Sequence, residues 1–243
     1  MTARAPKINT AMVLAAGRGE RLRPLTDNLP KPLLEVGGKA LIDHVLDRLA
    51  EAGVDRAVVN LWHLGALIEA HLAGRARPRV TFSPEAELMN TGGGVAQALP
   101  LLGSDPFYVI NGKILWRDGA RGALARLADA WPKDARDGAM DGLLLLVPLE
   151  RAGGYSAAGD FFLGGDGAIE RPEPGGPAPW VFTGIQILHP RLFADAPPGP
   201  FSLNLLYDRA MAAGRLFGLA HDGLWHHVAT AQGLAEAQAW FAR

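Results

Sequence analysis

The chain has 243 residues and a formal net charge of -1, from 24 Lys and Arg against 25 Asp and Glu. A charge so near zero gives no overall field that would gather DNA, RNA or an anionic membrane. Hydrophobic residues make up 49% of the chain, enough to fill a sizeable core, and the lack of cysteine excludes disulfides and thiolate metal sites. We expect one domain over residues 1–243 in a reducing, cytoplasmic compartment.

The first half of the sequence alternates strand-like and helix-like segments. Residues 10–16 form a continuous apolar run that ends at Gly17, which is typical of a strand buried on both faces. Apolar residues then recur at helical spacing over 41–52. Further strands are expected at 56–61, 79–82 and 107–111, and helices at 64–72 and, as a short start, 95–99. This alternation predicts a Rossmann-like, doubly wound α/β fold, with a mostly parallel sheet and helices on both faces.

The second half is less regular and contains a long segment rich in Gly, Pro and Asp. Within that segment, over 153–176, only short strands are expected at 160–163 and 168–170, as a loop-and-hairpin layer over the sheet. Glycine and proline over 153–179 also permit a mobile lid. The remaining expected elements are helices at 120–131, 204–213 and 231–241 and strands at 142–149, 181–188 and 216–219. Every apolar run is too short for a membrane-spanning helix.

The most informative segment, residues 14–32, reads LAAGRGERLRPLTDNLPKP. Gly17 and Gly19 follow a buried strand, so their backbone N–H groups can approach a phosphate closely. Arg21 can grip phosphoryl oxygens with two hydrogen bonds, and Lys31, between two prolines, offers a compact cation. A glycine turn beside basic residues is also a common structural feature. Neither the P-loop spacing nor the dinucleotide-binding fingerprint is present.

The same segment, continued by LLEVGGKALIDHVL, resembles the signature of the sugar-phosphate nucleotidyltransferases, LAAGxGxRLxPLTxxxPKPLLxVxGxPLI. Later segments are also similar to the family: NTGGG, FYVINGKILW, GDF, ERP and FTGIQILHPRLF. The chain looks most like the short members that transfer uridylyl to N-acetylmuramate 1-phosphate in cell-wall recycling. The resemblance implies a GT-A-like core whose cleft lies at the carboxyl ends of the strands.

The implied reaction joins an NTP to a sugar 1-phosphate and releases pyrophosphate, with UTP and N-acetylmuramate 1-phosphate as the favoured pair. By resemblance, Arg21 holds the β and γ phosphates and Lys31 draws both anionic reactants together at the α phosphate. The implied nucleotide-binding residues are Leu14, Ala15, Ala16, Gly17, Gly19, Arg21, Lys31, Asn90, Thr91, Gly92 and Asn111. The implied sugar-binding residues are Gly159, Glu170, Arg171 and Thr183.

The resemblance also implies Mg²⁺ held by two aspartates, but their positions carry Lys113 and His227. An ammonium cannot coordinate Mg²⁺, and imidazole is a poor ligand for it. Three readings stay open. The Lys113 ammonium takes the metal's place, so that binding survives while turnover falls; Asp118 or Asp222 recovers a metal; or Lys113 points to solvent and the site is broken.

Two rival functions remain at this point. One is transfer to mannose or glucose 1-phosphate from another NTP, and the other is a catalytically silent nucleotide-binding protein. A zinc site is not expected, because strand-like alternation places His226 and His227 on opposite faces. The sequence is compatible with a monomer or a small homo-oligomer.

Overall fold

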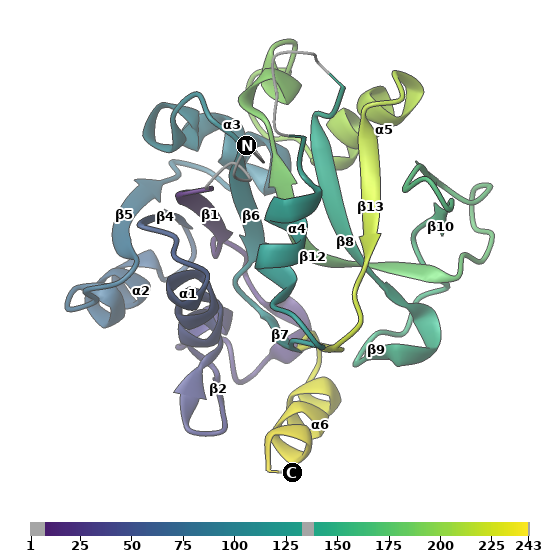
Figure 1. The fold of residues 1–243 in the computed structure, drawn as a ribbon. Helices are drawn as coiled ribbons and strands as arrows, with labels where there is room; N and C mark the ends of the chain where they lie inside the picture. Colours follow the sequence, from purple (N-terminus) through teal and green to yellow (C-terminus); the bar gives the residue numbers. More distant parts are fainter. Residues whose placement is uncertain (1–7, 133–138, 243) are drawn as a thin grey trace.

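The computed structural model describes residues 8–132 and 139–242, which form a seven-stranded sheet with helices on both faces (Figure 1). Its strand order is β13-β8-β12-β6-β1-β4-β5. Six strands run in the same direction and β12 runs against both of its neighbours. The bounds of the strands are β1 Thr10–Leu14, β4 Arg56–Leu61, β5 Arg79–Pro84, β6 Phe107–Asn111, β8 Gly142–Pro148, β12 Trp180–Leu188 and β13 Leu216–Ala220. The predicted mostly parallel sheet is confirmed.

Alternate residues of the buried strands enter two separate hydrophobic cores. On β1, Ala11 and Val13 pack in the core under α1 (Leu41–Glu51), α2 (Gly65–Leu72) and α4 (Ala123–Ala130). Met12 faces the other core, under α3 (Asn90–Leu102) and α5 (Asn204–Ala212). A period of two along each strand thus supplies both faces of the sheet with apolar side chains.

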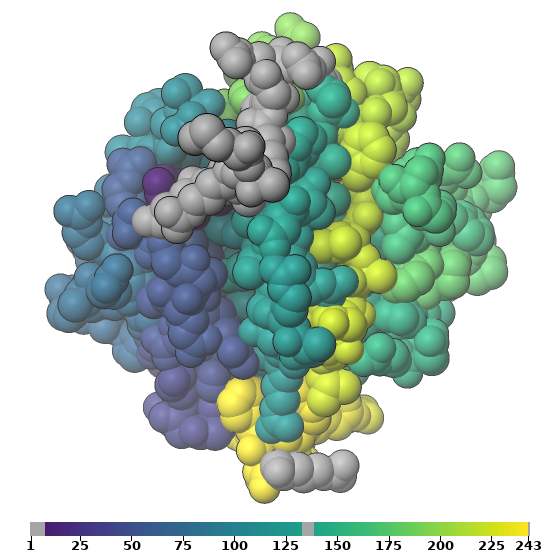
Figure 2. Space-filling model, in the orientation of Figure 1, coloured from purple at the N-terminus to yellow at the C-terminus, as the bar shows by residue number. Residues whose placement is uncertain are grey.

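A small sheet extends the carboxyl edge of the large one. Its strands are β7 (Ile114–Arg117), β14 (Leu224–His227) and β9 (Ala152–Gly153), in the order β7-β14-β9. The closing helix α6 (Ala231–Phe241) packs below it on a third core (Figure 1). In Figure 2, the C-terminal segment in yellow lies at the bottom of the molecule, beside the blue-purple segment that contains β2. The small sheet thereby holds the chain in place directly after strand β6.

Two hairpins complete the strand set. The first joins β2 (Glu35–Val36) to β3 (Lys39–Ala40) just before α1. The second joins β10 (Phe162–Leu163) to β11 (Ile169–Glu170), inside the glycine- and proline-rich segment. The expected hairpin is therefore confirmed, although its strands are only two residues long and it bridges to the edge strand β13.

Three expectations about the elements need correction. Strand β1 ends at Leu14 instead of residue 16, and α4 is shorter than the predicted 120–131. Helix α3 begins at Asn90, five residues before the predicted start, because its three glycines pack tightly against other segments. The strands β7 and β9 were not among the expected elements, and β14 was indicated only by the strand-like alternation at His226 and His227. All three are short, and their pairing partners lie far along the chain.

No helix in the described part of the chain combines the length and apolar character needed to span a membrane. The assignment of residues 1–243 to one domain stays a prediction.

Substitution of Leu146 by alanine tests the packing between the sheet and its second core. Leu146 is fully buried on β8, so removal of its side chain should lower the free energy of unfolding by about 2–5 kcal/mol. Urea denaturation followed by circular dichroism measures the change. The control Leu67→Ala removes a leucine that is 42% exposed on α2, and should stay within about 0.5 kcal/mol of the wild type. Equal effects of the two substitutions would contradict this packing.

Candidate functional site

A cavity of about 470 Å³ opens where β1 and β6 end, at the carboxyl edge of the sheet. Carboxyl ends of parallel strands are the usual place for a ligand site in such folds. The cavity is lined by Leu14, Ala15, Gly17, Arg18, Gly19, Glu20, Arg21, Lys31, Pro32, Leu88, Lys113 and Ala229. The predicted glycine turn, both predicted catalytic cations and Lys113 therefore share one cavity.

The glycine turn supplies open backbone at the cavity wall. A side chain at Gly17 would meet no atom within 4 Å, so its backbone is accessible from the cavity. Gly19 has φ +69° and packs so closely on Thr26 and Lys31 that a Cβ would lie 3.0 Å and 3.2 Å from their side chains. The Thr26 hydroxyl donates to the Gly19 carbonyl at 2.9 Å. Glycine is needed at position 19 for both conformation and space.

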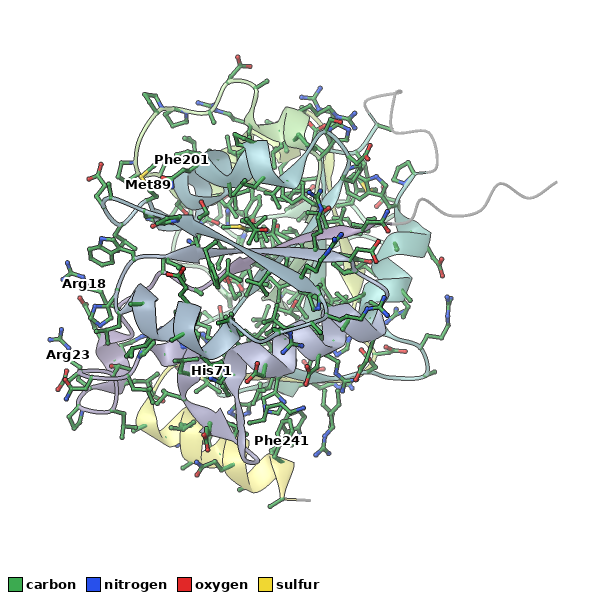
Figure 3. All side chains as sticks on the ribbon, turned by 90° about the vertical axis from the view of Figure 1, so that its left-hand side faces the viewer. Arg18, Arg23, His71, Met89, Phe201 and Phe241 are labelled. Carbon is green, nitrogen blue, oxygen red and sulfur yellow. The ribbon has the colours of Figure 1, made fainter. Side chains whose placement is uncertain are left out.

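Arg18 lies at the rim of this cavity. Its guanidinium stacks 4.8 Å from the Trp62 ring centroid and lies 3.7 Å from the carboxylate of Glu20. Figure 3 shows Arg18 and Arg23 projecting outward on one side of the molecule. Arg23 does not line the cavity and forms an exposed ion pair with Asp27.

Lys31 and Lys113 approach the cavity from two rigid segments. Lys31 begins the short helix Lys31–Leu33, with prolines on both sides, and is only 7% exposed. Lys113 lies in the turn between β6 and β7, just after Gly112, whose N–H donates to the Leu14 carbonyl at 2.9 Å. In the part of the chain that the structure describes, neither lysine forms an ion pair with a carboxylate.

Mutual repulsion and burial shift the pKa values of this site. Burial, then Lys113 and Arg21, lowers the pKa of Lys31 to about 7. Burial and Arg21 also lower the pKa of Lys113. Burial, then Lys113, Lys31 and Arg21, lowers the pKa of His227 to about 3, so this imidazole is neutral near pH 7. Such unbalanced positive charge is typical of a site that binds an anion.

A buried polar network fixes the start of the glycine turn. The backbone N–H of Ala15 donates to the Asn60 side chain at 2.7 Å, and Asn60 donates to Glu85 at 2.7 Å. The other oxygen of Glu85 accepts from the Met89 backbone N–H at 3.0 Å. A Cβ at Gly94 would lie 2.7 Å from Glu85 and 2.9 Å from Asn60, so only glycine leaves room for the network. The ends of β1 and β4 and the start of α3 are thereby joined.

The predicted base-recognition residues lie in the first turn of α3, outside the lining of this cavity. Both Gly92 and Gly93 donate their backbone N–H groups to the Phe201 carbonyl, at 2.8 Å and 3.1 Å. The Thr91 hydroxyl accepts from Leu203, and Asn90 accepts from the Thr91 N–H. Met89 and Phe201 lie beside each other (Figure 3). Several polar groups of this segment are thus already used inside the protein.

The predicted sugar residues gather around the first residues of β12 but line neither this cavity nor its neighbour. Gly159 has φ +95° and faces the Ala178 carbonyl, while the fully buried Thr183 hydroxyl donates to the Leu145 carbonyl at 2.8 Å. Arg171 pairs with Asp208 and stacks 4.9 Å from the Phe161 ring centroid. Glu170 is exposed on β11. Asn111 ends β6 and packs over Gly184, beside Thr183.

A second cavity of about 430 Å³ meets the first one at Arg21 and Ala229. Its lining contains polar side chains from around β9 and α6 that the sequence patterns did not single out: Tyr155, Ser156, Thr230, Gln232 and Glu236. Thr230 alone carried a signal, because its hydroxyl caps α6 by accepting from Gly233, as Ser and Thr often do. His227 also lines this second cavity.

The residues present do not fit a magnesium ion. Mg²⁺ prefers six oxygen ligands, several of them carboxylate or water. Glu20 is the one carboxylate among the residues lining the first cavity. Asp118 accepts from Ala123 and pairs with Arg48, and Asp222 pairs with Arg126, so neither is turned to the cavity. Among the described residues, no three His, Cys, Asp or Glu side chains are grouped to hold a metal.

The depressed pKa of Lys31 predicts a pH dependence of stability. Between its native value of about 7 and its ordinary 10.5, the unfolded chain holds a proton that the native protein has released. The unfolded state then binds more protons, so the free energy of unfolding gains a contribution that rises with pH across this window. Urea denaturation at several pH values should show a smaller rise for Lys31→Met.

The matched control is Lys39→Met, because Lys39 is exposed, pairs with Asp47 and lies away from this cavity. It should keep the wild-type slope. Identical slopes for the wild type and Lys31→Met would contradict the depressed pKa.

Comparison with known proteins agrees with this geometry. The family model described as nucleotidyl transferase matches residues 10–155. The chain is 45% identical over 97% of both sequences to an N-acetylmuramate alpha-1-phosphate uridylyltransferase of Caulobacter vibrioides. It is 41% identical, over 94% of this chain and 96% of the relative, to one of Neisseria meningitidis.

A solved structure of UDP-glucose pyrophosphorylase with UDP-glucose superposes with a TM-score of 0.76 at 18% identity, covering 97% of this chain and 98% of the other. That likeness confirms the fold. The family match and the two relatives confirm the resemblance predicted from residues 14–32: the chain belongs to the nucleotidyl transferase family, as a sugar-phosphate nucleotidyltransferase.

Proposed function

We propose that the protein transfers uridylyl from UTP to N-acetylmuramate 1-phosphate, which yields UDP-N-acetylmuramate and pyrophosphate for cell-wall recycling. The observation that carries the proposal is the convergence of Gly17, Arg21 and Lys31 on one cavity at the carboxyl edge of the sheet. Two relatives of nearly full-length coverage with this activity in their names support the choice of substrates.

In this proposal the triphosphate of UTP lies along the glycine turn. The Gly17 backbone approaches the phosphates, Lys31 contacts the α phosphate, and Arg21 holds the β and γ phosphates where the two cavities meet. Leu14, Ala15, Ala16 and Gly19 frame the same turn. The first turn of α3, with Asn90, Thr91 and Gly92, together with Asn111 remains the proposed base and ribose side.

The chemical step is an in-line displacement. A phosphate oxygen of the sugar 1-phosphate attacks the α phosphorus, the bond to the bridging oxygen breaks, and pyrophosphate leaves with the electron pair. Two anions must meet in this step, so cations that neutralise their repulsion and hold them in line supply most of the rate enhancement. Lys31 lies between the two reactants in this arrangement, and Arg21 receives the charge that develops on pyrophosphate.

The sugar is proposed to lie on the side of Gly159, Glu170, Arg171 and Thr183, close to the first residues of β12. These residues come from separate segments that the fold brings to one neighbourhood. Arg171 is held by Asp208 and Asn204, so it must exchange those partners to contact a sugar phosphate. Arg171 directly follows the hairpin β10–β11, so this exchange of partners involves only its side chain and that short segment.

A second candidate is a catalytically silent nucleotide-binding protein, favoured by Lys113 in the cavity wall and by the lack, among the described residues, of a carboxylate pair there. Members of the family generally use Mg²⁺. We therefore propose that turnover of this chain is lower than that of a variant with a carboxylate at position 113.

A pyrophosphate-release assay with UTP and N-acetylmuramate 1-phosphate tests the function. We expect slow transfer by the wild type, and a gain of about 100-fold or more for Lys113→Asp in Mg²⁺, since a carboxylate can hold the ion beside the phosphates. GTP or dTTP with mannose or glucose 1-phosphate should give less product. Thermal stabilisation by UTP without product from either protein favours the silent alternative. Fast Mg²⁺-dependent turnover by the wild type would refute the proposed impairment.

Arg21→Ala tests the assignment of the β and γ phosphates. Loss of charged hydrogen bonds worth about 1.5–3 kcal/mol should weaken UTP binding by about 10–100-fold. Isothermal titration calorimetry measures the dissociation constant. Arg23→Ala is the control, because Arg23 lies two residues away, outside the cavity, in an exposed ion pair with Asp27. UTP binding that falls equally in both variants would point to general attraction between charges instead of a built contact.

A further inference from the structure

The backbone at Lys113 is held in place by contacts on both sides. Before it, Leu14 pairs with Asn111 in the parallel ladder of β1 and β6, and Gly112 donates to the Leu14 carbonyl. A Cβ at Gly112 would lie 3.1 Å from that carbonyl oxygen, so the turn approaches β1 closely. After it, Ile114 pairs with His227 in the small sheet. The backbone of Lys113 therefore cannot swing away from the cavity without breaking two ladders.

Of the four cationic side chains that line the cavity, Arg18 lies near Glu20, and the other three have no carboxylate to balance them among the described residues. Arg21, Lys31 and Lys113 come from three segments and all line the same 470 Å³ space. Within residues 8–132 and 139–242, none of the three forms an ion pair. Glu20, the carboxylate in the lining, is 63% exposed and lies 3.7 Å from Arg18. A bound anion would supply the negative charge that these three side chains lack.

The neighbouring imidazole does not alter this balance. His227 stacks on Trp225, with ring centroids 5.8 Å apart, on the face of β14 opposite His226. His226 instead contacts the Gly233 carbonyl at 2.8 Å and stacks near Trp240. The two histidines thus cannot share an ion, and His227 offers a nitrogen where Mg²⁺ prefers oxygen.

A divalent cation would add two positive charges to a wall of cationic side chains that already repel one another, and it would gain hardly any oxygen ligand. A polyphosphate, in contrast, brings about four negative charges and many acceptor oxygens at neutral pH. Ammonium and guanidinium groups bind phosphate oxygens directly and need no bridging ion. The same wall therefore repels Mg²⁺ and attracts metal-free phosphates.

We propose that Lys113 stands in for the divalent cation, so that this chain binds the polyphosphate part of its nucleotide without a protein-bound metal ion. The inference rests on the proposed function, because that function places nucleotide phosphates in this cavity. It deepens the function by stating that the polyphosphate binds free of Mg²⁺. Of the three readings of Lys113 left open by the sequence, the structure favours this one: Asp118 and Asp222 are engaged elsewhere, and Lys113 lines the cavity.

Inorganic tripolyphosphate is the sharpest probe, because it lacks both base and sugar. Its dissociation constant should be measured by titration calorimetry with wild-type protein, once in EDTA and once in excess Mg²⁺. We expect binding in EDTA that Mg²⁺ weakens, since Mg²⁺ neutralises the probe. Tighter binding in Mg²⁺, or no binding in either condition, would overturn the proposal.

Variants at position 113 separate charge from folding. Lys113→Met should weaken tripolyphosphate binding in EDTA by about tenfold or more, while Lys113→Arg keeps the charge and should stay within about threefold of the wild type. Lys39→Met, outside the cavity and paired with Asp47, should bind as the wild type does. Wild-type affinity in a folded Lys113→Met protein would refute the role of the ammonium. Thermal unfolding of each variant confirms that it is folded.

The two proposals fail in different ways. Metal-free tripolyphosphate binding in a protein that transfers no uridylyl overturns the proposed function alone. Transfer activity in a protein that binds tripolyphosphate only with Mg²⁺ overturns the role of Lys113 alone. A titration with Mn²⁺, followed by electron paramagnetic resonance, gives a further test. We expect the spectrum of the free ion. Bound Mn²⁺ that Lys113→Met does not affect would also contradict the proposal.

Discussion

The repulsion among Arg21, Lys31 and Lys113 is the constraint on which the site depends. Burial and mutual repulsion lower the pKa values of both lysines, so the charged form of these side chains is costly without an anion beside them. Such an arrangement persists only where the surrounding backbone is held firmly. Here the ends of β1 and β6, the proline-bounded turn at Lys31 and the ladder of β7 and β14 hold it. An anionic ligand then relieves the repulsion among the three cations, so the binding of the anion and the protonation of the lysines favour each other.

The same rigidity extends from the phosphate side to the first turn of α3 through buried hydrogen bonds. Asn60 joins the Ala15 backbone to Glu85, and Glu85 holds the Met89 backbone. Asn60 and Glu85 are almost fully shielded from water, so each needs its partner, and loss of one leaves another unpaired. The network therefore couples the position of the glycine turn to that of α3. A nucleotide that spans the two would meet both in a fixed relation.

Local sequence predicted most elements well, and the misses have physical causes. Apolar runs such as 107–111 and 56–61 match the observed strands, since burial on both faces requires such runs. Helix α3 begins five residues before the predicted start, in a glycine-rich stretch, although glycine disfavours helices. Its glycines are required instead by Phe201, Asn60 and Glu85, which leave no room for a Cβ. Strands β7, β9 and β14 pair across about 70 to 110 residues, a separation that no local pattern reports.

By itself, the sequence determined the family, through residues 14–32, and the kinds of groups available: a glycine turn, one arginine, one lysine, and a lysine where an acid was expected. Only the tertiary structure decided that Arg21, Lys31 and Lys113 line one cavity, that Asp118 and Asp222 are engaged elsewhere, and that polar groups of Thr91 and Gly92 are already bonded. A sequence motif is recognised from residues that are neighbours along the chain. Charge balance and hydrogen-bond satisfaction depend on neighbours in space, which the parallel sheet brings together from distant segments.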